Sequence, residues 1–354
     1  MRYEKKVVAE MPLAYAIGTL DGSDARSFVV GVEKKGPIRR FALDGTPMET
    51  VAEGPGGVMT VTQMPGRTDQ LLATSEFFSP NYGADTAGIV SYTRGADGAW
   101  EARRICDLPY VHRFGIVQAA DGRLWLLACT IKESCRQIKN DWLHAGAVFA
   151  APLDEPVESY DVEAGAPLEL TCLAGQQLQN HGFWMAPDRS YVLVATAAGV
   201  FRYTPPAAEG EDWDISCLIV QPTSDICMAD FDGDGVDEIL TLSPFHGDTL
   251  SVWHAAEAED TYQLVWTDPE RKPFLHAIWS GELLGEPCAI IGNRKGDRDL
   301  FRVHCVDGEY QLEVIDHDHG PANCWVTTDD DGTQRIIAAN RETNEVAVYT
   351  VSND

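Results

Sequence analysis

An apolar segment that ends in small residues recurs seven times along the chain, at intervals of about 50 residues. Each copy follows a turn rich in Gly, Asp or Pro and precedes a segment in which apolar and polar residues alternate. Repeats of this length are typical of β-propeller blades, each of which is one small sheet. The seven copies are SFVVGV (from Ser27), QLLATS (Gln70), WLLACT (Trp125), VLVATA (Val192), EILTLS (Glu238), AIIGNR (Ala289) and IIAANR (Ile336).

The segments between these copies complete four strands per repeat. Alternating stretches such as GIVSYTR (from Gly88) and TLSVWHA (Thr249) come third, and a stretch such as YQLVWTD (Tyr262) usually comes fourth. No helical periodicity interrupts them. We therefore expect an all-β fold, a seven-bladed β-propeller with four antiparallel strands per blade, as one domain over residues 1–354. A β-sandwich of similar strand number is the alternative, but it gives no reason for a sevenfold repeat.

The last repeat supplies only three strands, NCWVTT, QRIIAAN and EVAVYTV. The segment KKVVAE at residues 5–10 has strand character and precedes the first repeat. We expect it to be the missing fourth strand of the last blade, because a closed ring has no free sheet edges that invite aggregation.

Composition limits the partners of the chain. Its 27 Lys and Arg residues against 55 Asp and Glu residues give a formal charge of -28 at pH 7, which disfavours nucleic acids and membrane surfaces as partners. No apolar run approaches the ~18 residues of a spanning helix, and the first ten residues lack the apolar core of a secretory signal, so we expect a cytoplasmic protein. The nine cysteines form no CxxC pair, which gives no indication of a disulfide framework or of a cysteine zinc site.

The sharpest local motif is DFDGDGVDE at residues 230–238. Carboxylates at its first, third, fifth and ninth positions, a glycine at the sixth and a backbone carbonyl at the seventh can surround a hard cation with oxygen atoms. We expect Ca²⁺ or Mg²⁺ to bind there in a structural role, the alternative being a solvated acidic turn. The expected ligands are Asp230, Asp232, Asp234, the Val236 carbonyl and Glu238. The loop resembles the calcium-binding blade motif of FG-GAP/VCBS repeats in integrin-like propellers.

Three histidines occupy equivalent positions when the repeats are aligned on their second strands. Counting back about 14 residues from the middle of that strand reaches His112, His181 and His276, in the similar contexts YVHRFGI, QNHGFWM and FLHAIWS. This position begins the innermost strand of a blade, so we expect the three imidazoles to face the central channel at one height. Three imidazoles with a vacant fourth position suit Zn²⁺, Mn²⁺ or Fe²⁺. The alternative is a set of polar channel residues bonded to water.

Further groups could support such a metal site. They are Asn180, Asn323, Asp225, Arg113 and the run Asp316 to His319, which has the alternative interpretation of a solvated polar turn.

The stretch FLHAIWSGELLGEPCAIIG (residues 274–292) resembles degenerate blades in the propeller of aldos-2-ulose dehydratase, and the histidines resemble those of the metal-bearing propeller of oligogalacturonate lyase. This resemblance implies a metal-dependent lyase or dehydratase that acts by β-elimination on an oxidised or acidic sugar. His319, or a channel histidine that is not a metal ligand, is then the candidate base, and Arg113 or Lys132 would neutralise a substrate carboxylate. Sugar-stacking faces could come from the aromatic residues Trp142, Phe183, Trp184, Trp279 and Trp325, or these could simply pack between blades.

A non-catalytic platform that binds a protein or a carbohydrate is the alternative function, because a propeller fold alone does not establish activity. The insertion ESCRQIKNDWLHAG at residues 133–146 is longer than a hairpin turn and could cover the channel or bind a partner. No GxSxG, P-loop, HExxH or Rossmann glycine motif is present, so serine hydrolysis, nucleotide chemistry and nicotinamide binding have no positive support. The resemblance to sugar lyases implies a small carbohydrate-type substrate as the partner, and the platform alternative allows a protein partner.

Overall fold

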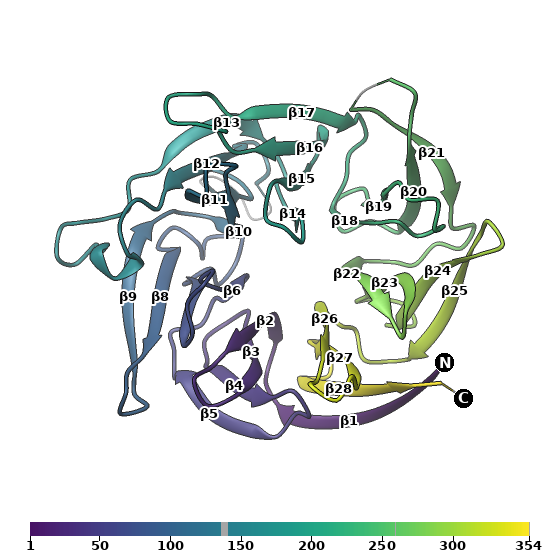
Figure 1. The fold of residues 1–354 in the computed structure, drawn as a ribbon, viewed down its shortest axis with the longest axis horizontal. Coiled ribbons are helices and arrows are strands. Elements are labelled where there is room, and N and C mark those ends of the chain that lie inside the picture. Colours follow the sequence, from purple (N-terminus) through teal and green to yellow (C-terminus); the bar gives the residue numbers. More distant parts are fainter. Residues whose placement is uncertain (136–140, 259, 354) are drawn as a thin grey trace.

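Seven four-stranded antiparallel sheets stand in a ring around a central axis in the computed structural model, which describes residues 1–135, 141–258 and 260–353 (Figure 1). The predicted seven-bladed propeller is confirmed. The seven apolar copies found in the sequence are the second strands of the seven blades. They are β3 (Arg26–Val32), β7 (Gln70–Ser75), β11 (Leu124–Thr130), β15 (Val192–Thr196), β19 (Glu238–Ser243), β23 (Glu286–Asn293) and β27 (Gln334–Asn340).

The innermost strand of each blade lines the axis. These strands are β2 (Ala14–Asp21), β6 (Val61–Gln63), β10 (Val111–Gln118), β14 (Gly182–Met185), β18 (Asp225–Ala229), β22 (Leu275–Leu283) and β26 (Asn323–Thr328). The third strands are β4 (Ile38–Ala42), β8 (Gly88–Arg94), β12 (Gly146–Pro152), β16 (Gly199–Thr204), β20 (Thr249–Ala255), β24 (Leu300–Val306) and β28 (Glu345–Ser352). The outermost strands are β5 (Pro47–Ala52), β9 (Trp100–Asp107), β13 (Thr171–Gln177), β17 (Asp214–Ile219), β21 (Tyr262–Thr267), β25 (Glu309–Asp316) and β1 (Arg2–Glu10).

Burial across a blade explains why the second strands carry the strongest sequence signal. All six residues of β7 and of β19 are buried, because each second strand packs against a neighbouring blade on both of its faces. The outer strands keep polar residues on an exposed face, as in β17 and β25. A single turn of 3₁₀ helix (Val157–Ser159) is the one helical element in the described residues, none of which belongs to a helix able to cross a membrane.

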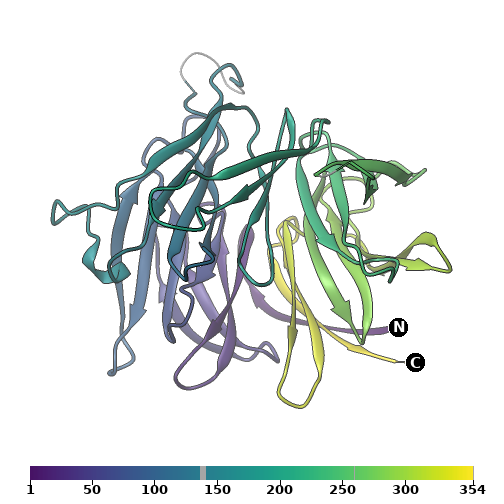
Figure 2. The ribbon, with the colours of Figure 1, turned by 45° about the horizontal axis from the view of Figure 1, so that its top comes forward.

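The ring closes through the N-terminal strand, as predicted, and the closing strand is longer than residues 5–10. β1 pairs antiparallel with β28 from Arg2 opposite Ser352 to Glu10 opposite Glu345, so both chain ends lie side by side in blade seven (Figures 1 and 2). The Lys5 Nζ atom lies 2.9 Å from a carboxylate oxygen of Asp316 and 2.9 Å from one of Glu345. Closure therefore joins blade seven to the last strand of blade six as well.

Deletion of residues 2–10 should destabilise the whole ring. β28 would gain a free edge, and the loss of several kcal/mol should lower Tm by about 5 °C or more. Thermal unfolding and light scattering measure the two effects, and a peptide with the sequence of β1 added in excess should restore part of the lost Tm. An unchanged Tm without aggregation would contradict this role of β1.

Candidate functional site

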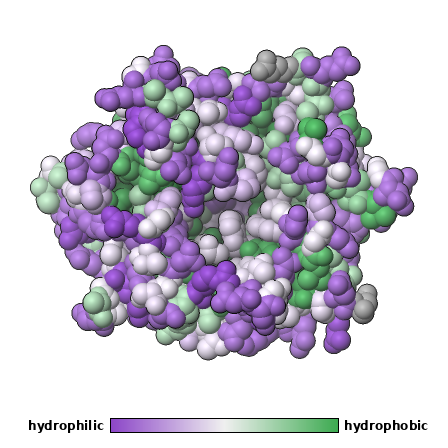
Figure 3. Space-filling model, viewed as in Figure 1, coloured by the Kyte–Doolittle hydropathy of each residue, from purple (hydrophilic) through white to green (hydrophobic). Residues whose placement is uncertain are grey.

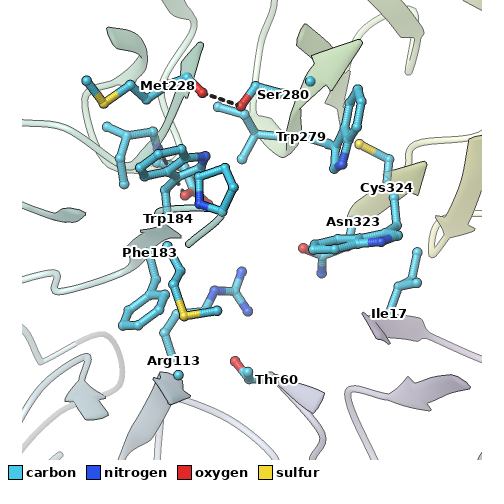
Figure 4. Close-up of a pocket in the computed structure, with 18 of the residues that line it drawn as sticks. Ile17, Thr60, Arg113, Phe183, Trp184, Met228, Trp279, Ser280, Asn323 and Cys324 are labelled. Carbon is cyan, nitrogen blue, oxygen red and sulfur yellow. Dashed lines mark hydrogen bonds between the residues drawn. The ribbon is translucent and has the colours of Figure 1, made fainter. Parts of the chain in front are cut away.

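A cavity of about 620 Å³ lies on the axis of the ring, and all seven inner strands contribute to its wall (Figure 4). The space-filling view shows the centre of this face hollowed and surrounded by mostly hydrophilic residues (Figure 3). Its volume lies within the range of ordinary small-molecule sites. The central channel is thus open enough to hold a ligand at this end.

Aromatic side chains form much of the cavity wall. Four of the five aromatic residues singled out in the sequence lie there: Phe183, Trp184, Trp279 and Trp325. Because their ring faces come from three different blades, a flat or sugar-like ligand could be stacked from several sides. The fifth, Trp142, packs instead against Phe245, with a ring centroid distance of 5.1 Å, and is not part of the cavity lining that the structure describes.

Two buried charged groups lie deep in the cavity. The Arg113 guanidinium points from β10 towards its centre (Figure 4) and donates a hydrogen bond to the Met59 carbonyl. Among the described residues no carboxylate forms an ion pair with it, although its side chain is almost fully buried. Asp225 also lines the cavity, and burial raises the pKa of its carboxyl to about 7, while the charge of Arg113 acts in the opposite direction. An unpaired, buried guanidinium is a binding group for an anion.

Four histidines, one more than predicted, meet on the axis beside this cavity. His112, His181 and His276 come together from their three blades, with ring centroids 4.6 Å apart for His112 and His181 and 5.2 Å apart for His181 and His276. His246 joins them, 5.0 Å from His181 and 5.4 Å from His276. Nitrogen atoms of His181, His246 and His276 all lie within 4.8 Å of one another. The closest group of three therefore contains His246 in the place of the predicted His112.

Hydrogen bonds fix the orientation of two of these rings. His181 Nδ1 donates to the Ser224 carbonyl at 3.0 Å, and His276 Nδ1 donates to the Ala322 carbonyl at 2.6 Å. A carbonyl can only accept, so Nε2 of each ring carries the lone pair. The Nε2 atoms of His181 and His246 are buried and have no hydrogen-bond partner among the described residues. His181, with Nδ1 held by the backbone and Nε2 free, has the usual arrangement of a metal-binding histidine.

Burial also keeps these imidazoles neutral. It lowers the pKa of His181 and of His276 well below 6.5, and the positive charges of Arg113 and Arg294 lower both further. Burial lowers the pKa of His246 to about 3. Metal binding requires the neutral ring, so the donor set of this cluster fits a transition-metal ion.

A repeated backbone feature aims these side chains at the axis. His112 and His276 each occupy a bulge where the pairing of the inner strand with the second strand skips one residue. Two residues earlier, Tyr110 and Phe274 have positive φ values of 61° and 62°, and Gln179 precedes His181 in the same way with φ 53°. Each such conformation costs about 1–3 kcal/mol in a non-glycine residue. The feature recurs in three blades and brings their side chains to the same cluster.

His246 was not found from the sequence because it lies outside the inner strands. It belongs to the loop between β19 and β20, where its ring stacks between Phe245 and Phe274 with centroid distances of 4.0 and 4.5 Å. An alignment on strands leaves such a loop without an equivalent position. The available signal was the aromatic–His pair itself in the segment SPFHGD.

The other two predicted catalytic residues lie away from the cavity. His319 is part of the ring closure, where its Nε2 is 2.7 Å from Lys5 Nζ and its Nδ1 is 3.2 Å from a Glu345 oxygen. Lys132 is fully buried and its Nζ lies 3.9 Å from the centre of the Trp142 ring. Residues 136–140 of the insertion that contains Trp142 lie outside the described residues. Arg113 is thus the predicted catalytic residue that the structure places in the cavity.

The predicted cation loop brings its carboxylates together. Oxygen atoms of Asp230, Asp232, Asp234 and Glu238 all lie within 4.8 Å of one another, and Val236 lies in the same turn. The Asp230 carboxylate accepts hydrogen bonds from the backbone of Gly233 and Gly235 at 2.7 and 3.0 Å, and these residues have φ values of 79° and 91° that favour glycine.

Charge repulsion in this loop favours a bound cation. Burial raises the pKa of Glu238 to about 7, and the neighbouring charges of Asp232 and Asp230 add to the effect. The loop also touches the central cavity, because Asp230 and Asp237 belong to its lining. His254, whose Nε2 lies 3.8 Å from an Asp232 oxygen, forms a second possible donor group with Asp232 and Glu238.

Comparison with known proteins supports the fold and does not name a family. No protein-family model and no curated protein matches the chain. Among solved structures it is similar to one from Bacteroides uniformis, provisionally named as a 6-phosphogluconolactonase, with a TM-score of 0.58 and 14% sequence identity over 95% of this chain and 91% of that one. At this identity the similarity shows the fold alone. The resemblance to FG-GAP/VCBS repeats rests on residues 230–238.

Calcium should raise the Tm of the wild-type protein by several degrees at concentrations well above Kd, because binding to the folded state at 100 times Kd adds about 2.7 kcal/mol. The double variant Asp232→Asn/Asp234→Asn should lose this response. Asp330→Asn/Asp331→Asn in the corresponding turn of blade seven removes the same charge and should keep it. A Tm that is insensitive to both Ca²⁺ and Mg²⁺ in the wild type would leave the solvated acidic turn as the correct interpretation.

Proposed function

We propose that the protein is a metal-dependent enzyme that acts on a small acidic or oxidised sugar in the central channel, by β-elimination. One observation carries this proposal: a buried guanidinium without an ion pair among the described residues and a buried carboxyl line one aromatic-walled cavity, and a cluster of neutral imidazoles lies directly behind that carboxyl. Perturbed buried groups that converge at a cavity are typical of active sites.

Arg113 is the group that binds the substrate anion. Its charge lies deep in the cavity, so the acidic end of a ligand would enter first and the rest would extend towards the opening. A guanidinium binds a carboxylate through two parallel hydrogen bonds, and this fixes the orientation of the ligand. Trp184 and Trp279 lie on the walls around it and supply faces against which the apolar side of a sugar ring packs (Figure 4).

Asp225 is the group that moves the proton. Elimination next to a carboxylate requires a base that takes the proton from the adjacent carbon. The electron pair of the broken C–H bond forms the new C=C bond, and the β-oxygen leaves with its own bonding pair and takes up a proton. Asp225 faces the cavity and is the described carboxyl nearest to the histidines, with Oδ2 3.6 Å from His181 Nδ1.

The histidine cluster lies directly behind this carboxyl. Since His181 is held between Ser224 and Asp225, any group bound at its Nε2 is coupled to the position of Asp225. A divalent metal ion bound by His181, His246 and His276 would supply a Lewis acid at this end of the cavity.

Elimination predicts an unsaturated product. Purified protein supplied with Zn²⁺, Mn²⁺ or Fe²⁺ should generate ultraviolet absorbance from at least one member of a panel of uronides, aldonic acids and keto-sugars. Arg113→Gln should raise KM by roughly 10- to 100-fold, as expected for the loss of a charged hydrogen bond. Asp225→Asn should lower kcat even at saturating metal. Arg123→Gln, in the turn between β10 and β11 and outside the cavity lining, is the matched control.

The alternative function is a binding platform for a carbohydrate or a protein, and one observation favours it. None of the four histidines belongs to the lining of the cavity as the structure describes it. Calorimetry separates the two functions: a platform would bind an acidic sugar with an affinity that depends on Arg113 and Trp279, would form no product, and would be insensitive to chelators. Such a result would overturn the enzyme proposal.

A further inference from the structure

The hydroxyl group of Tyr15 contacts the histidine cluster at His276. Tyr15 is buried, and its oxygen is 3.2 Å from His276 Nε2. Its ring centroid is 5.4 Å from that of His276 and 6.4 Å from that of His112. A phenol oxygen is a metal donor, so this cluster contains one oxygen donor in addition to its imidazole nitrogens.

Tyr15 reaches the axis through the same backbone feature as the histidines. The pairing of β2 with β3 skips Tyr15, which lies between Ala14 and Ala16. The inner strands of blades three and six skip His112 and His276 in the same way when they pair with their second strands. Leu13, two residues earlier, has the same positive φ, 57°. Tyr15 is thus the blade-one equivalent of His112 and His276. A structural pattern that delivers donors to the axis in blades three and six delivers a phenol in blade one.

The direction of the hydrogen bond shows which lone pair is occupied. His276 Nδ1 donates to the Ala322 carbonyl, so Nε2 of this ring can only accept. The Tyr15 hydroxyl is therefore the donor. It occupies the lone pair of His276 that a metal ion would need, whereas the corresponding nitrogens of His181 and His246 have no partner.

The distance between the Tyr15 oxygen and His276 Nε2 also suits two ligands of one metal ion. Two ligand atoms of a tetrahedral zinc ion, each about 2.0–2.1 Å from the metal, are about 3.3 Å apart. The Tyr15 oxygen and His276 Nε2 are 3.2 Å apart before any ion binds. The three imidazole nitrogens, within 4.8 Å of one another, would then have to draw closer around the same point.

We propose that Tyr15 is the fourth protein ligand of a transition-metal site formed with His181, His246 and His276. This proposal rests on the metal site of the proposed function. When the ion binds, the phenol proton leaves to solvent, the O–H electron pair stays on oxygen, and oxygen and His276 Nε2 both donate to the metal without any change of oxidation state. Three imidazoles and one phenolate suit Zn²⁺, Mn²⁺, Fe²⁺ or Co²⁺ in preference to Ca²⁺. A substrate oxygen would then be a fifth ligand.

Titration of the full-length, metal-free protein with Zn²⁺ and with Co²⁺ tests this ligand. Calorimetry in buffers of different ionisation enthalpy should show about one proton released per ion in the wild type at about pH 6, because neutral imidazoles release none and a zinc-bound water, with a pKa of about 7, releases little. A tyrosinate signal should appear in the ultraviolet difference spectrum. Tyr15→Phe should lose both signals, bind Zn²⁺ at least about tenfold more weakly, and change the visible Co²⁺ spectrum. Tyr203→Phe, a buried phenol outside the cluster, is the control and should behave as wild type.

The outcomes separate this proposal from the function on which it rests. Tighter Zn²⁺ binding by Tyr15→Phe would mean that the phenol only competes for the His276 lone pair, and unchanged binding would mean that it takes no part. Either result overturns Tyr15 as a ligand and leaves the histidine site intact. If His112→Ala weakens Zn²⁺ binding and Tyr15→Phe does not, the fourth ligand is His112, and this result also overturns Tyr15 as a ligand. A wild-type protein that binds no transition metal would overturn both proposals. If Tyr15→Phe fails to fold, proton release and the tyrosinate signal of the wild type still show whether a tyrosine binds the metal ion.

Discussion

Antiparallel pairing of β1 with β28 is the constraint on which the channel depends. β1 is the outermost strand of blade seven and leads directly into blade one, so its pairing with β28 ties the first and last blades of the ring together. A cavity whose wall takes residues from every inner strand exists only in the closed ring. The ion pairs of Lys5 with Asp316 and Glu345 lie at this seam, which explains why His319 lies there too and not in the channel.

The repeat made the architecture predictable because burial enforces it. A second strand packed on both faces needs continuous apolar sequence, so each blade repeats that signal whatever its loops contain. Equivalent positions then made His112, His181 and His276 predictable, since the inner strands share one backbone path. His246 and Tyr15 were not predictable in the same way. His246 lies in a loop without equivalents. In blade one, counting about 14 residues back from the middle of β3 reaches Ala16, whereas the bulge in β2 places Tyr15 at the axis.

The contents of the channel contrast with the charge of the molecule. The chain carries a formal charge of -28, and the cavity lining includes Asp230, Asp237 and Glu282, yet a guanidinium without an ion pair lies within. An anion would have to pass acidic groups to reach Arg113, so the field at the opening disfavours anions in general. A ligand that combines one carboxylate with several hydroxyl groups can both pass the acidic lining and bind at Arg113. Its hydroxyls donate hydrogen bonds to the carboxylate side chains, and its carboxylate pairs with the guanidinium. A cation in the loop of residues 230–238 would weaken the repulsion, since Asp230 belongs to both the loop and the lining.

Positive charge near the histidine cluster opposes the binding of a metal ion there. Arg113 and Arg294 already lower the pKa of His181 and His276, so a divalent ion among these rings would add positive charge to a buried region that has some in excess. Desolvation makes such an excess costly unless anions balance it. The structure offers two balancing groups of its own, the Asp225 carboxylate beside His181 and the Tyr15 phenol on His276, and the carboxylate of a substrate at Arg113 would be a third. Metal binding, ionisation of Tyr15 and anion binding in the cavity are then linked. Within each pair, one event should favour the other by the same coupling free energy as in the reverse direction.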